Sequence, residues 1–477
     1  MSLHERPRLI LHVGIPKTGT TSLQHSLASN ATRLLSMGGG VNYCLFKPYE
    51  ESVNHKSLVN AITHEFFSMN DDDTITSRGF SEFALMPVKN KVDFIKKSFY
   101  ESNCKTLVLS HEGFITGFDF ISECTDHFDE NTRARYKEYV ISYVKNFFDE
   151  FDIKVVIYLR RQDNYIESMY NQIMKRRPVK DINLTFKNGY LINSAMQAFL
   201  TRNDMITFCD YYSHLYQLSN VYGKENVIVR VYEKNQMPNG TVYDFYKHVL
   251  CFDDNEIDVL LAENHTVNES KIKDLVEYNI ALAQDASRDM AHKEISSGRL
   301  NKLPSILGKL PSLDFLCKSN KNILTAKQAS DFLDLFEESN EKVAREYLGR
   351  EDGVLFRDKP RDEADDYKGL SHQATFHISK ELILFYKESY ERLKENNERL
   401  HKKLLDTNAE QASEKRVHLN ANILLDPTKV KQNPQCNQLS ELKTKNHELE
   451  NEIKNLQNST SWKITKPLRI MKKFFHK

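Results

Sequence analysis

The sequence predicts an α/β fold in which a parallel sheet is flanked by helices, followed by a helical extension and a C-terminal coiled coil. Short, continuous apolar runs alternate with longer helical patterns over the first half of the 477-residue chain, which is typical of strands buried on both faces. The expected strands cover residues 9–13, 106–110, 154–159 and 226–231, and the helical patterns between them include 132–151 and 163–176. This order favours a doubly wound domain.

The composition is that of a folded protein with balanced charge. Hydrophobic residues make up 40% of the chain, and 66 Lys and Arg balance 66 Asp and Glu, so we expect no nucleic acid partner. The seven cysteines are scattered and form no C-x-x-C pair, so neither a disulfide framework nor a zinc site is expected. Apolar runs of signal-peptide or membrane-spanning length are missing, and we expect a cytoplasmic protein.

We expect five regions along the chain. Residues 1–270 form the α/β domain, and residues 271–348 form a helical extension packed on it. Residues 349–377 are dense in charged and turn-forming residues and are interpreted as a linker. A helical and coiled-coil region with a polar break follows at 378–458, and a basic amphipathic tail occupies 459–477.

The coiled-coil prediction depends on a heptad pattern near the end of the helical region. From Leu439 to Leu456, apolar residues and one asparagine alternate three and four residues apart, as a and d positions require. Asn446 takes an a position, where a buried amide favours a two-stranded coil. Because the pattern spans barely three heptads, two interpretations remain open: a homodimer seam and a solvated single helix.

The tail, STSWKITKPLRIMKKFFHK, mixes six Lys or Arg with large apolar side chains and contains no acidic residue. A segment of this kind can lie in an anionic membrane interface, with its aromatic side facing the lipid. The alternative is a helix packed on a neighbouring part of the protein. Peripheral contact with an anionic membrane is therefore one of two interpretations of the tail.

The chemistry is concentrated at two places where a strand passes through a turn into a helix. In the first, LILHVGIPKTGTTSLQHSL, Gly14 and Gly19 have the separation of a nucleotide-binding P-loop, but Thr20 stands where that loop has its lysine. Free backbone N–H groups and the helix dipole make such a turn a site for phosphate or sulfate. The residues expected to bind this anion are Pro16, Lys17, Thr18, Gly19, Thr20, Thr21 and Ser22.

The position of the lysine bears on the type of anion. In a nucleoside triphosphatase the lysine follows the second glycine, and the next hydroxyl holds magnesium. Here Lys17 precedes that glycine, and no strand ends in an aspartate pattern suited to the metal. The loop therefore predicts a P-loop-like fold whose anion is bound without a metal ion.

The second segment, IKVVIYLRRQDNYIESMYNQIMK, is again strand, turn and helix. Arg160 closes the strand, and Ser168 lies eight residues on, within the helix. An arginine at the carboxyl end of a strand faces the crevice where ligands bind in open α/β sheets. A guanidinium and a helical hydroxyl can hold a second phosphate. Two anion sites imply a nucleoside ligand with phosphates at both ends.

These two segments resemble the two signatures of sulfotransferases that use PAPS, 3′-phosphoadenosine 5′-phosphosulfate. PKTGTTS resembles the site for the 5′-phosphosulfate, and YLRRQDNYIES resembles the site for the 3′-phosphate. The resemblance is nearer to bacterial enzymes that sulfate sugars of cell-surface polysaccharides, to which YGKENVIVRVYE is also similar, and it covers residues 9–269. It implies that Lys17 stabilises charge on the leaving oxygen, while Arg160 and Ser168 hold the 3′-phosphate.

The base that accepts the proton of the acceptor hydroxyl is expected in TLVLSHEGF, just beyond a predicted strand. Glu112 is the favoured candidate, because a carboxylate has this role in some sugar sulfotransferases that the chain resembles. His111 is the base type of the cytosolic members of that family, and the two candidates remain open.

The sequence therefore predicts a transferase that moves the sulfuryl group of PAPS to a carbohydrate hydroxyl by in-line displacement. The resemblance implies an acceptor in polysaccharide biosynthesis, a bacterial cell-surface glycan or its lipid-linked precursor, and hence work at the inner face of a membrane. The alternatives are a P-loop kinase acting on a sugar or small molecule, and a non-catalytic membrane-associated scaffold. The displaced Lys17 argues against the kinase, and the presence of Lys17, Arg160 and Ser168 argues against the scaffold.

Overall fold

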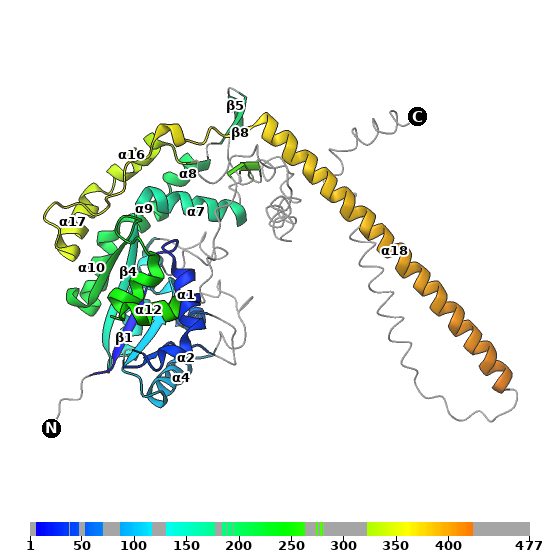
Figure 1. Cartoon of the computed structure of the whole chain (residues 1–477), viewed down its shortest axis with the longest axis horizontal. Helices are drawn as coiled ribbons and strands as arrows, with labels where there is room; N and C mark the ends of the chain where they lie inside the picture. The colour runs from blue at the N-terminus through cyan, green and yellow to red at the C-terminus, as the bar shows by residue number, and fades with distance from the viewer. Residues whose placement is uncertain are drawn as a thin grey trace. The chain divides into compact units, whose positions relative to one another are not determined.

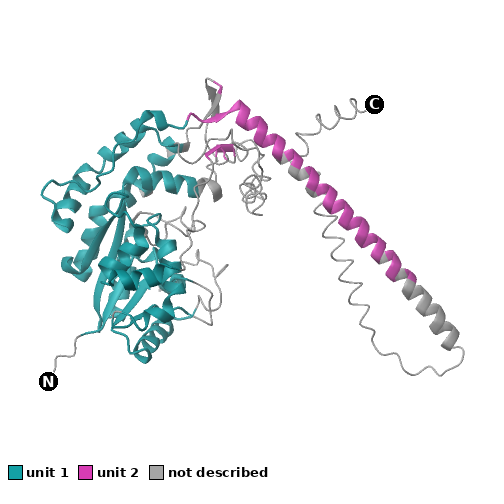
Figure 2. Cartoon of the chain, in the orientation of Figure 1, with its two compact units in different colours: residues 1–172, 195–270, 320–367 teal, residues 173–194, 271–319, 368–477 magenta. Residues whose placement is uncertain are grey.

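The computed structural model describes residues 6–37, 39–46, 53–69, 86–116, 130–176, 184–187, 189–193, 195–262, 273–274, 277–278, 280 and 322–422. The chain divides into two compact units, which Figure 2 colours separately. Unit 1 comprises residues 1–172, 195–270 and 320–367, and unit 2 comprises residues 173–194, 271–319 and 368–477.

Unit 1 is built on a five-stranded sheet in which every strand pair is parallel (Figure 1). The strand order is β2-β3-β1-β4-β7. The strands are β1 (Arg8–His12), β2 (Val41–Asn42), β3 (Thr106–Ser110), β4 (Asp152–Arg160) and β7 (Val227–Tyr232). The predicted α/β class with a parallel sheet flanked by helices is thus confirmed.

Helices connect the strands and cover both faces of the sheet. Within and bordering unit 1 they are α1 (Thr20–Ser29), α2 (Ala31–Leu34), α3 (Lys56–Met69), α4 (Val88–Glu101), α5 (Gly113–Thr116), α6 (Glu130–Phe147), α7 (Gln162–Arg176), α8 (Ala195–Leu200), α9 (Asn203–Cys209), α10 (Tyr211–Tyr222), α11 (Gly240–Asp244), the π-helical turn Phe245–Val249, α12 (Asp254–Leu261), α16 (Ala326–Asp334) and α17 (Glu337–Leu348).

Both faces of the central strands are buried, which explains their continuous apolar runs. Ile10 of β1 belongs to the core that includes Leu23 and Leu27 of α1. Its neighbours Leu9 and Leu11 point to the opposite face, since side chains alternate along a strand, and they are buried as well. The four predicted strands agree with the structure to within two residues at each end. Strand β2 was not predicted, because it has only two residues and no apolar run marks it in the sequence.

Helices α16 and α17 lie in the stretch 271–348 that the sequence predicts as a helical extension, and α17 packs beside α10 (Figure 1). Tyr212 Oη donates a hydrogen bond of 3.1 Å to Glu346, and Ser219 and Tyr347 are joined by one of 2.9 Å. Residues 281–321 lie outside the described part of the chain.

Residues 350–367, which the sequence analysis interprets as part of a linker, are instead anchored on unit 1; we call them the strap. The Glu233 carboxylate accepts hydrogen bonds from the backbone N–H groups of Arg357, at 2.7 Å, and Asp358, at 2.8 Å. Arg161 Nη1 donates to the carbonyls of Asp358 and Lys359, at 2.9 and 3.0 Å. Turn-forming residues suggest a linker, but partners more than 100 residues away in sequence hold the strap in place.

Unit 2 contains a small antiparallel sheet and a long helix. The sheet has the order β5-β6-β8, with β5 (Leu184–Lys187), β6 (Tyr190–Asn193) and β8 (Leu370–Ser371), and α18 (His372–Asn422) follows directly. The predicted helix at the start of 378–458 lies within α18. The heptads of 439–456 and the tail of 459–477 lie outside the described residues.

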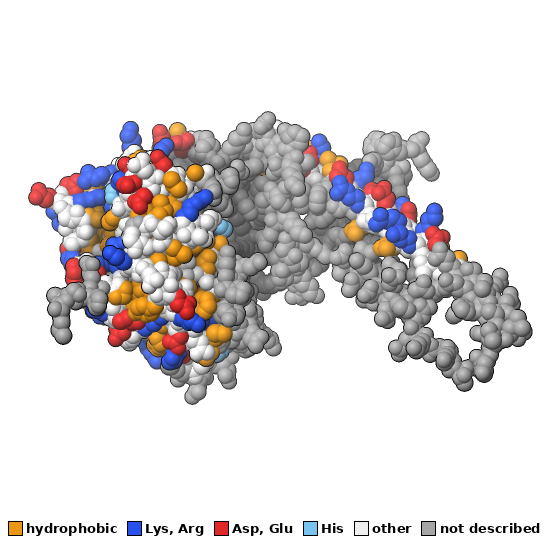
Figure 3. All heavy atoms as spheres, turned by 60° about the horizontal axis from the view of Figure 1, so that its bottom comes forward, with side chains coloured by type: hydrophobic (Ala, Val, Ile, Leu, Met, Phe, Trp, Pro, Cys, Tyr) orange, Lys and Arg blue, Asp and Glu red, His pale blue; other side chains and the backbone are white. Residues whose placement is uncertain are grey.

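The surface agrees with the balanced composition. On the face of unit 1 that Figure 3 presents, acidic and basic side chains are interspersed among apolar and uncharged ones, and both signs also alternate along α18. Within the described residues, none of the helices combines the length and the apolar character that crossing a membrane requires.

Candidate functional site

The order of the strands has a switch point between β1 and β4, at their carboxyl ends. From β1 the chain passes through α1 to β2 on one side, while from β4 it passes through α7 and α10 to β7 on the other. Adjacent strands that lead in opposite directions leave a gap between their loops, where ligands of open α/β sheets bind. The loop of residues 13–19 and Arg160 flank this gap, as the sequence analysis expects of an anion site.

The unequal lengths of β1 and β4 bring these two segments together. His12, the last residue of β1, is paired with Val156, so β4 continues four residues further to Arg160, about 13 Å at about 3.3 Å per residue. The loop after β1 lies along these last residues of β4. Val13 N–H donates to Val156 O at 3.0 Å, and Arg160 Nη1 donates to Lys17 O at 2.6 Å.

Side chains and left-handed backbone conformations shape the loop. Thr18 Oγ1 donates to Ile15 O at 2.6 Å, and Thr241 Oγ1 of α11 donates to Thr18 O at 2.7 Å. Lys17 and Gly19 have positive φ angles of 70° and 83°. A Cβ on Gly19 would lie 2.5 Å from Thr241 Oγ1, so this position needs glycine for both its backbone angle and its close contact.

The backbone amides after the loop are left open. Within the described residues, the N–H groups of Thr18, Gly19, Thr20, Thr21 and Ser22 have no hydrogen-bond acceptor. Helix α1 has no side-chain cap at Gly19, whereas α10, α12 and α16 are capped by Asp210, Asp253 and Thr325. A helix N-terminus with unpaired donors and a positive dipole end binds anions. The described amides of Thr18 to Ser22 thus have the donor arrangement that the predicted anion site requires.

The predicted hydroxyl donors divide into two pairs. Thr18 is buried and bonded to the loop carbonyl of Ile15, and Thr20 is buried and hydrogen-bonds the carboxyl group of Glu112. Thr21 is exposed, and Ser22 is half-buried. In the described part of the chain, the hydroxyls of Thr21 and Ser22 are thus not engaged in a hydrogen bond of this kind. Pro16 is buried and has no N–H to contribute.

The two consecutive arginines after β4 have different environments. Arg161 is buried, and its Nε and Nη2 donate to both oxygens of Asp163, at 2.7 and 2.8 Å. Arg160 makes no ion pair with a carboxylate among the described residues, and its guanidinium lies 5.6 Å from the ring centre of Tyr232. Its charge therefore remains available to an anion, while that of Arg161 is neutralised within the protein.

Ser168 is half-buried on α7, on the same connection as Arg160. No hydrogen bond joins the two side chains in the described part of the chain. The preceding residue, Glu167, is turned toward the strap, where its carboxylate pairs with Arg361. The structure thus places Ser168 on α7, the helix that follows β4, and shows no hydrogen bond between it and Arg160 in the described part of the chain.

Glu112 lies beside the candidate anion loop, and it follows a different neighbour of β1 from the strand that carries Arg160. It follows β3, which pairs with β1 on the side away from β4. Thr20 and Gln24 of α1 hydrogen-bond its side chain, and the Lys17 ammonium attracts it. Burial raises the pKa of the Glu112 carboxyl above its ordinary value, against the opposing effect of these partners. A buried carboxylate beside a cationic loop is a suitable proton acceptor.

His111 faces a different environment. Its Nδ1 accepts a hydrogen bond of 2.9 Å from Gly113 N–H, and its ring packs edge-on against Phe114. Burial, with the nearby charges of His55 and Lys56, lowers the pKa of His111 to about 3. The imidazole is thus neutral at pH 7, and its interactions hold the turn into α5 rather than the anion loop.

Three side chains at this site were not among the predicted residues. Gln24 contacts Glu112, Thr241 holds the loop, and Ser110 hydrogen-bonds both Gln24 and His12. Gln24 stands at the end of the TGTTSLQ motif, one helical turn after Thr20, which was a usable signal. Thr241 lies more than 200 residues from the loop in sequence, and no local pattern marks it.

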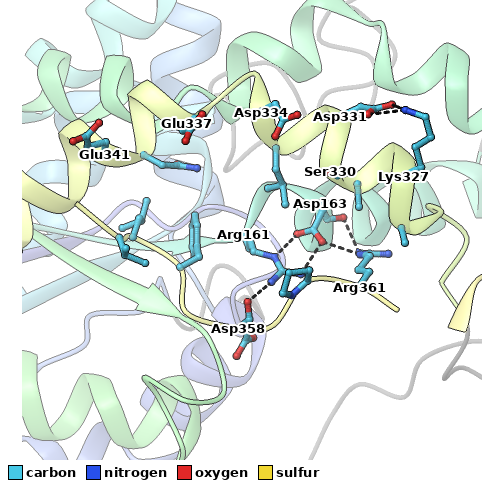
Figure 4. A pocket seen from close by; sticks show the side chains of 18 of the residues that line it. Arg161, Asp163, Lys327, Ser330, Asp331, Asp334, Glu337, Glu341, Asp358 and Arg361 are labelled. Atoms are coloured by element: carbon cyan, nitrogen blue, oxygen red, sulfur yellow. Dashed lines mark hydrogen bonds and ion pairs between the residues drawn. The ribbon is translucent and has the colours of Figure 1, made fainter. Parts of the chain in front are cut away.

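A cavity of about 1020 Å³ lies elsewhere in unit 1, between the strap and the helices α16 and α17 (Figure 4). Its floor carries the ion pairs of Asp163 with Arg161 and Arg361, and acidic side chains of both helices line its wall, as Figure 4 shows. None of the residues predicted to bind the anions lines this cavity.

Comparison with known proteins adds a distant relative and no family. No family model matches the chain, and no solved structure matches it. A protein from Archaeoglobus fulgidus named only as uncharacterized is 27% identical over 208 residues, which is 41% of this chain and 46% of that protein. The aligned part therefore spans about half the length of the relative.

Proposed function

We propose that the chain is a PAPS-dependent sulfotransferase that transfers a sulfuryl group to a carbohydrate hydroxyl. The observation that carries the proposal is a loop whose five amides, Thr18 to Ser22, have no acceptor among the described residues. Arg160, which forms no ion pair in the described part of the chain, flanks this loop on one side, and Glu112 flanks it on the other. This arrangement combines an anion cradle, a second cation and a proton acceptor at one end of the sheet.

The residues present fit the co-substrate. The open amides of Thr18 to Ser22 suit the 5′-phosphosulfate, since they match an anion that has no metal partner. Arg160 suits the 3′-phosphate, and the resemblance adds Ser168. PAPS supplies the activated sulfuryl group, whose leaving group is a phosphate oxygen.

The transfer requires one proton acceptor and charge stabilisation at the leaving oxygen. Glu112 takes the proton of the acceptor hydroxyl, and the acceptor oxygen forms the new bond to sulfur. The bond from sulfur to the 5′-phosphate oxygen breaks, and its electron pair stays on that oxygen. Lys17 and the loop amides then stabilise the negative charge.

The wider setting follows from the resemblance. A bacterial cell-surface glycan or its lipid-linked precursor would be the acceptor, met at the cytoplasmic face of the inner membrane. The basic tail of 459–477 would provide the peripheral contact, and the heptads of 439–456 would provide a homodimer seam. These parts of the proposal rest on sequence alone.

Calorimetric titration with adenosine 3′,5′-bisphosphate, the product of transfer from PAPS, tests the site directly. We expect binding by the wild type, a loss of at least about 100-fold in Arg160→Ala, and little binding of ATP with magnesium, since removing a charged partner costs roughly 2–3 kcal/mol or more. Arg399→Ala, at an exposed position on α18, is the matched control and should bind as the wild type does.

Sulfate transfer from ³⁵S-labelled PAPS to a panel of mono- and oligosaccharides then tests the reaction. We expect Lys17→Met and Glu112→Gln to lower the rate while leaving bisphosphate binding within about tenfold. Preference for ATP with magnesium, or binding of neither nucleotide, would overturn the proposed function.

A further inference from the structure

The side-chain amide of Gln24 is held in one orientation between α1 and the end of β3. Asn54 Oδ1 accepts from Lys56 N–H at 3.1 Å, which places Asn54 Nδ2 as the donor to Gln24 Oε1, at 3.0 Å. Gln24 Nε2 therefore faces the other way, where it donates to Ser110 Oγ at 3.2 Å. Its second N–H remains for the Glu112 carboxyl, which the Gln24 side chain also contacts.

The partners of Gln24 are themselves fixed by the backbone. Ser110 N–H donates to His55 Nδ1 at 3.1 Å, and His55 N–H donates back to Ser110 O at 3.2 Å. Ser110 Oγ also hydrogen-bonds His12 Nδ1 at 2.8 Å, and burial lowers the pKa of His12 to about 3, so this ring is neutral. The network beneath Glu112 therefore does not depend on Glu112 for its own order.

The groups around Glu112 act in opposite directions. Thr20 and Gln24 donate hydrogen bonds to its carboxyl and Lys17 attracts it, whereas burial penalises its charge. Tyr43 also faces it, and the charge of Glu112 contributes to raising the pKa of that phenol. The hydrogen bond from Gln24 counteracts the effect of burial on the pKa of Glu112. Removing this donor should therefore raise the pKa of Glu112 and allow its carboxyl to rotate more freely.

We propose that Gln24 is a positioning residue that donates a hydrogen bond to the Glu112 carboxylate and orients it toward the acceptor. The inference rests on the proposed function for the identity of the reaction, but the Gln24–Glu112 interaction can be measured without it. The amide acts through Glu112 and touches neither the co-substrate nor the acceptor.

The first test measures the ionisation of Glu112 by NMR on protein labelled with ¹³C at the glutamate carboxyls, with Glu112→Gln to assign the signal. In Gln24→Met we expect the pKa of Glu112 to rise by about one unit, because a charge-assisted hydrogen bond is lost. Asn54→Ala removes the hydrogen bond that orients the Gln24 amide but leaves the amide itself in place. It should therefore give a smaller rise in the pKa of Glu112. Gln197→Met, at an exposed glutamine of α8, is the matched control.

The second test follows slow hydrolysis of PAPS, with water as the acceptor, between pH 5 and pH 9. In Gln24→Met we expect kcat at pH 7 to fall about tenfold, KM to stay within about twofold, and the acidic limb to move to higher pH. In a Glu112→Gln background the same substitution should change kcat less than twofold, because its effect passes through Glu112.

The outcomes separate the two proposals. Normal bisphosphate binding with an unmoved Glu112 pKa and an unmoved pH profile would overturn the role of Gln24 and leave the proposed function standing. An equal fall in kcat at every pH, repeated in the Glu112→Gln background, would also overturn it, since that is the result of a merely structural defect. Failure of the wild type to bind the bisphosphate would overturn the proposed function and the positioning role of Gln24 in the reaction together.

Discussion

Arg160 Nη1 donates a hydrogen bond of 2.6 Å to the backbone carbonyl of Lys17, across the gap between β4 and the loop after β1. The residue predicted to hold one phosphate thus also fixes the loop predicted to hold the other. A guanidinium can serve both purposes because it has five N–H donors in a planar fork. The bond to Lys17 O uses one of these donors, and in the described part of the chain the others have no acceptor. The two proposed anion sites therefore share a single side chain.

Arg160→Lys tests this double role. An ammonium keeps the charge but cannot reach the loop carbonyl and a phosphate with fixed geometry, so bisphosphate binding should weaken by about 10- to 100-fold. Calorimetry measures the change, and circular dichroism checks that the fold is kept. Binding within twofold of the wild type would contradict the geometric argument and leave only a requirement for charge.

Gly19→Ala tests the shape of the loop. The new Cβ would meet Thr241 Oγ1 at 2.5 Å in a backbone conformation with φ of 83°, so the loop must move and bisphosphate binding should fall by more than about tenfold. Gly349→Ala is the matched control, because Gly349 also has a positive φ but has no atom within 4 Å of its added Cβ. It should lower stability slightly and leave binding intact; equal losses of binding in both variants would refute the close-contact argument.

Asp163→Asn tests the ion cluster under the strap. The Asp163 side chain is fully buried and pairs with both Arg161 and Arg361, so its neutralisation should lower the free energy of unfolding by about 3–5 kcal/mol. Urea titration measures the loss. Asp331→Asn breaks the exposed pair with Lys327 and should change stability little. A similarly small change in Asp163→Asn would show that the cluster contributes no more than a surface pair.

Stability should fall as the solution is made mildly acidic. Burial lowers the pKa of His12 and His214 to about 3 and that of His55 to about 4. Below about pH 6.5, these histidines therefore bind protons in the unfolded chain but stay neutral in the folded chain. The stabilisation is complete above pH 6.5 and is lost at about 1.4 kcal/mol per pH unit for each histidine as pH falls toward these lowered values. The raised pKa of Glu112 acts in the opposite direction and reduces the slope.

Urea titrations at pH 7.5, 6.0 and 5.0 check this expectation. His12→Asn keeps an acceptor for Ser110 but removes one titrating ring, so its stability should depend less steeply on pH. An unfolding free energy that stays constant between pH 7.5 and pH 5.0 would contradict the neutral, buried state of these histidines.

The sequence by itself determined four of the five parallel strands and the place of the candidate anion loop, because these depend on local patterns. The apolar run of β3 is long enough to identify, and the glycines, lysine and hydroxyls of residues 14–22 form one continuous motif. Arg160 could be assigned to the carboxyl end of its strand for the same reason.

Only the tertiary structure decided which of these side chains form hydrogen bonds or ion pairs within the described part of the protein and which have groups left over for a ligand. Arg160 and Arg161 are identical neighbours in sequence, but among the described residues only Arg161 forms an ion pair with Asp163 and hydrogen bonds to carbonyls of the strap. Thr241 reaches the loop across 223 residues, and Glu112 and Gln24 meet because β3 and β1 are neighbours in the sheet. Local propensity cannot specify such pairs, since their hydrogen bonds form only when distant segments pack together and exclude water.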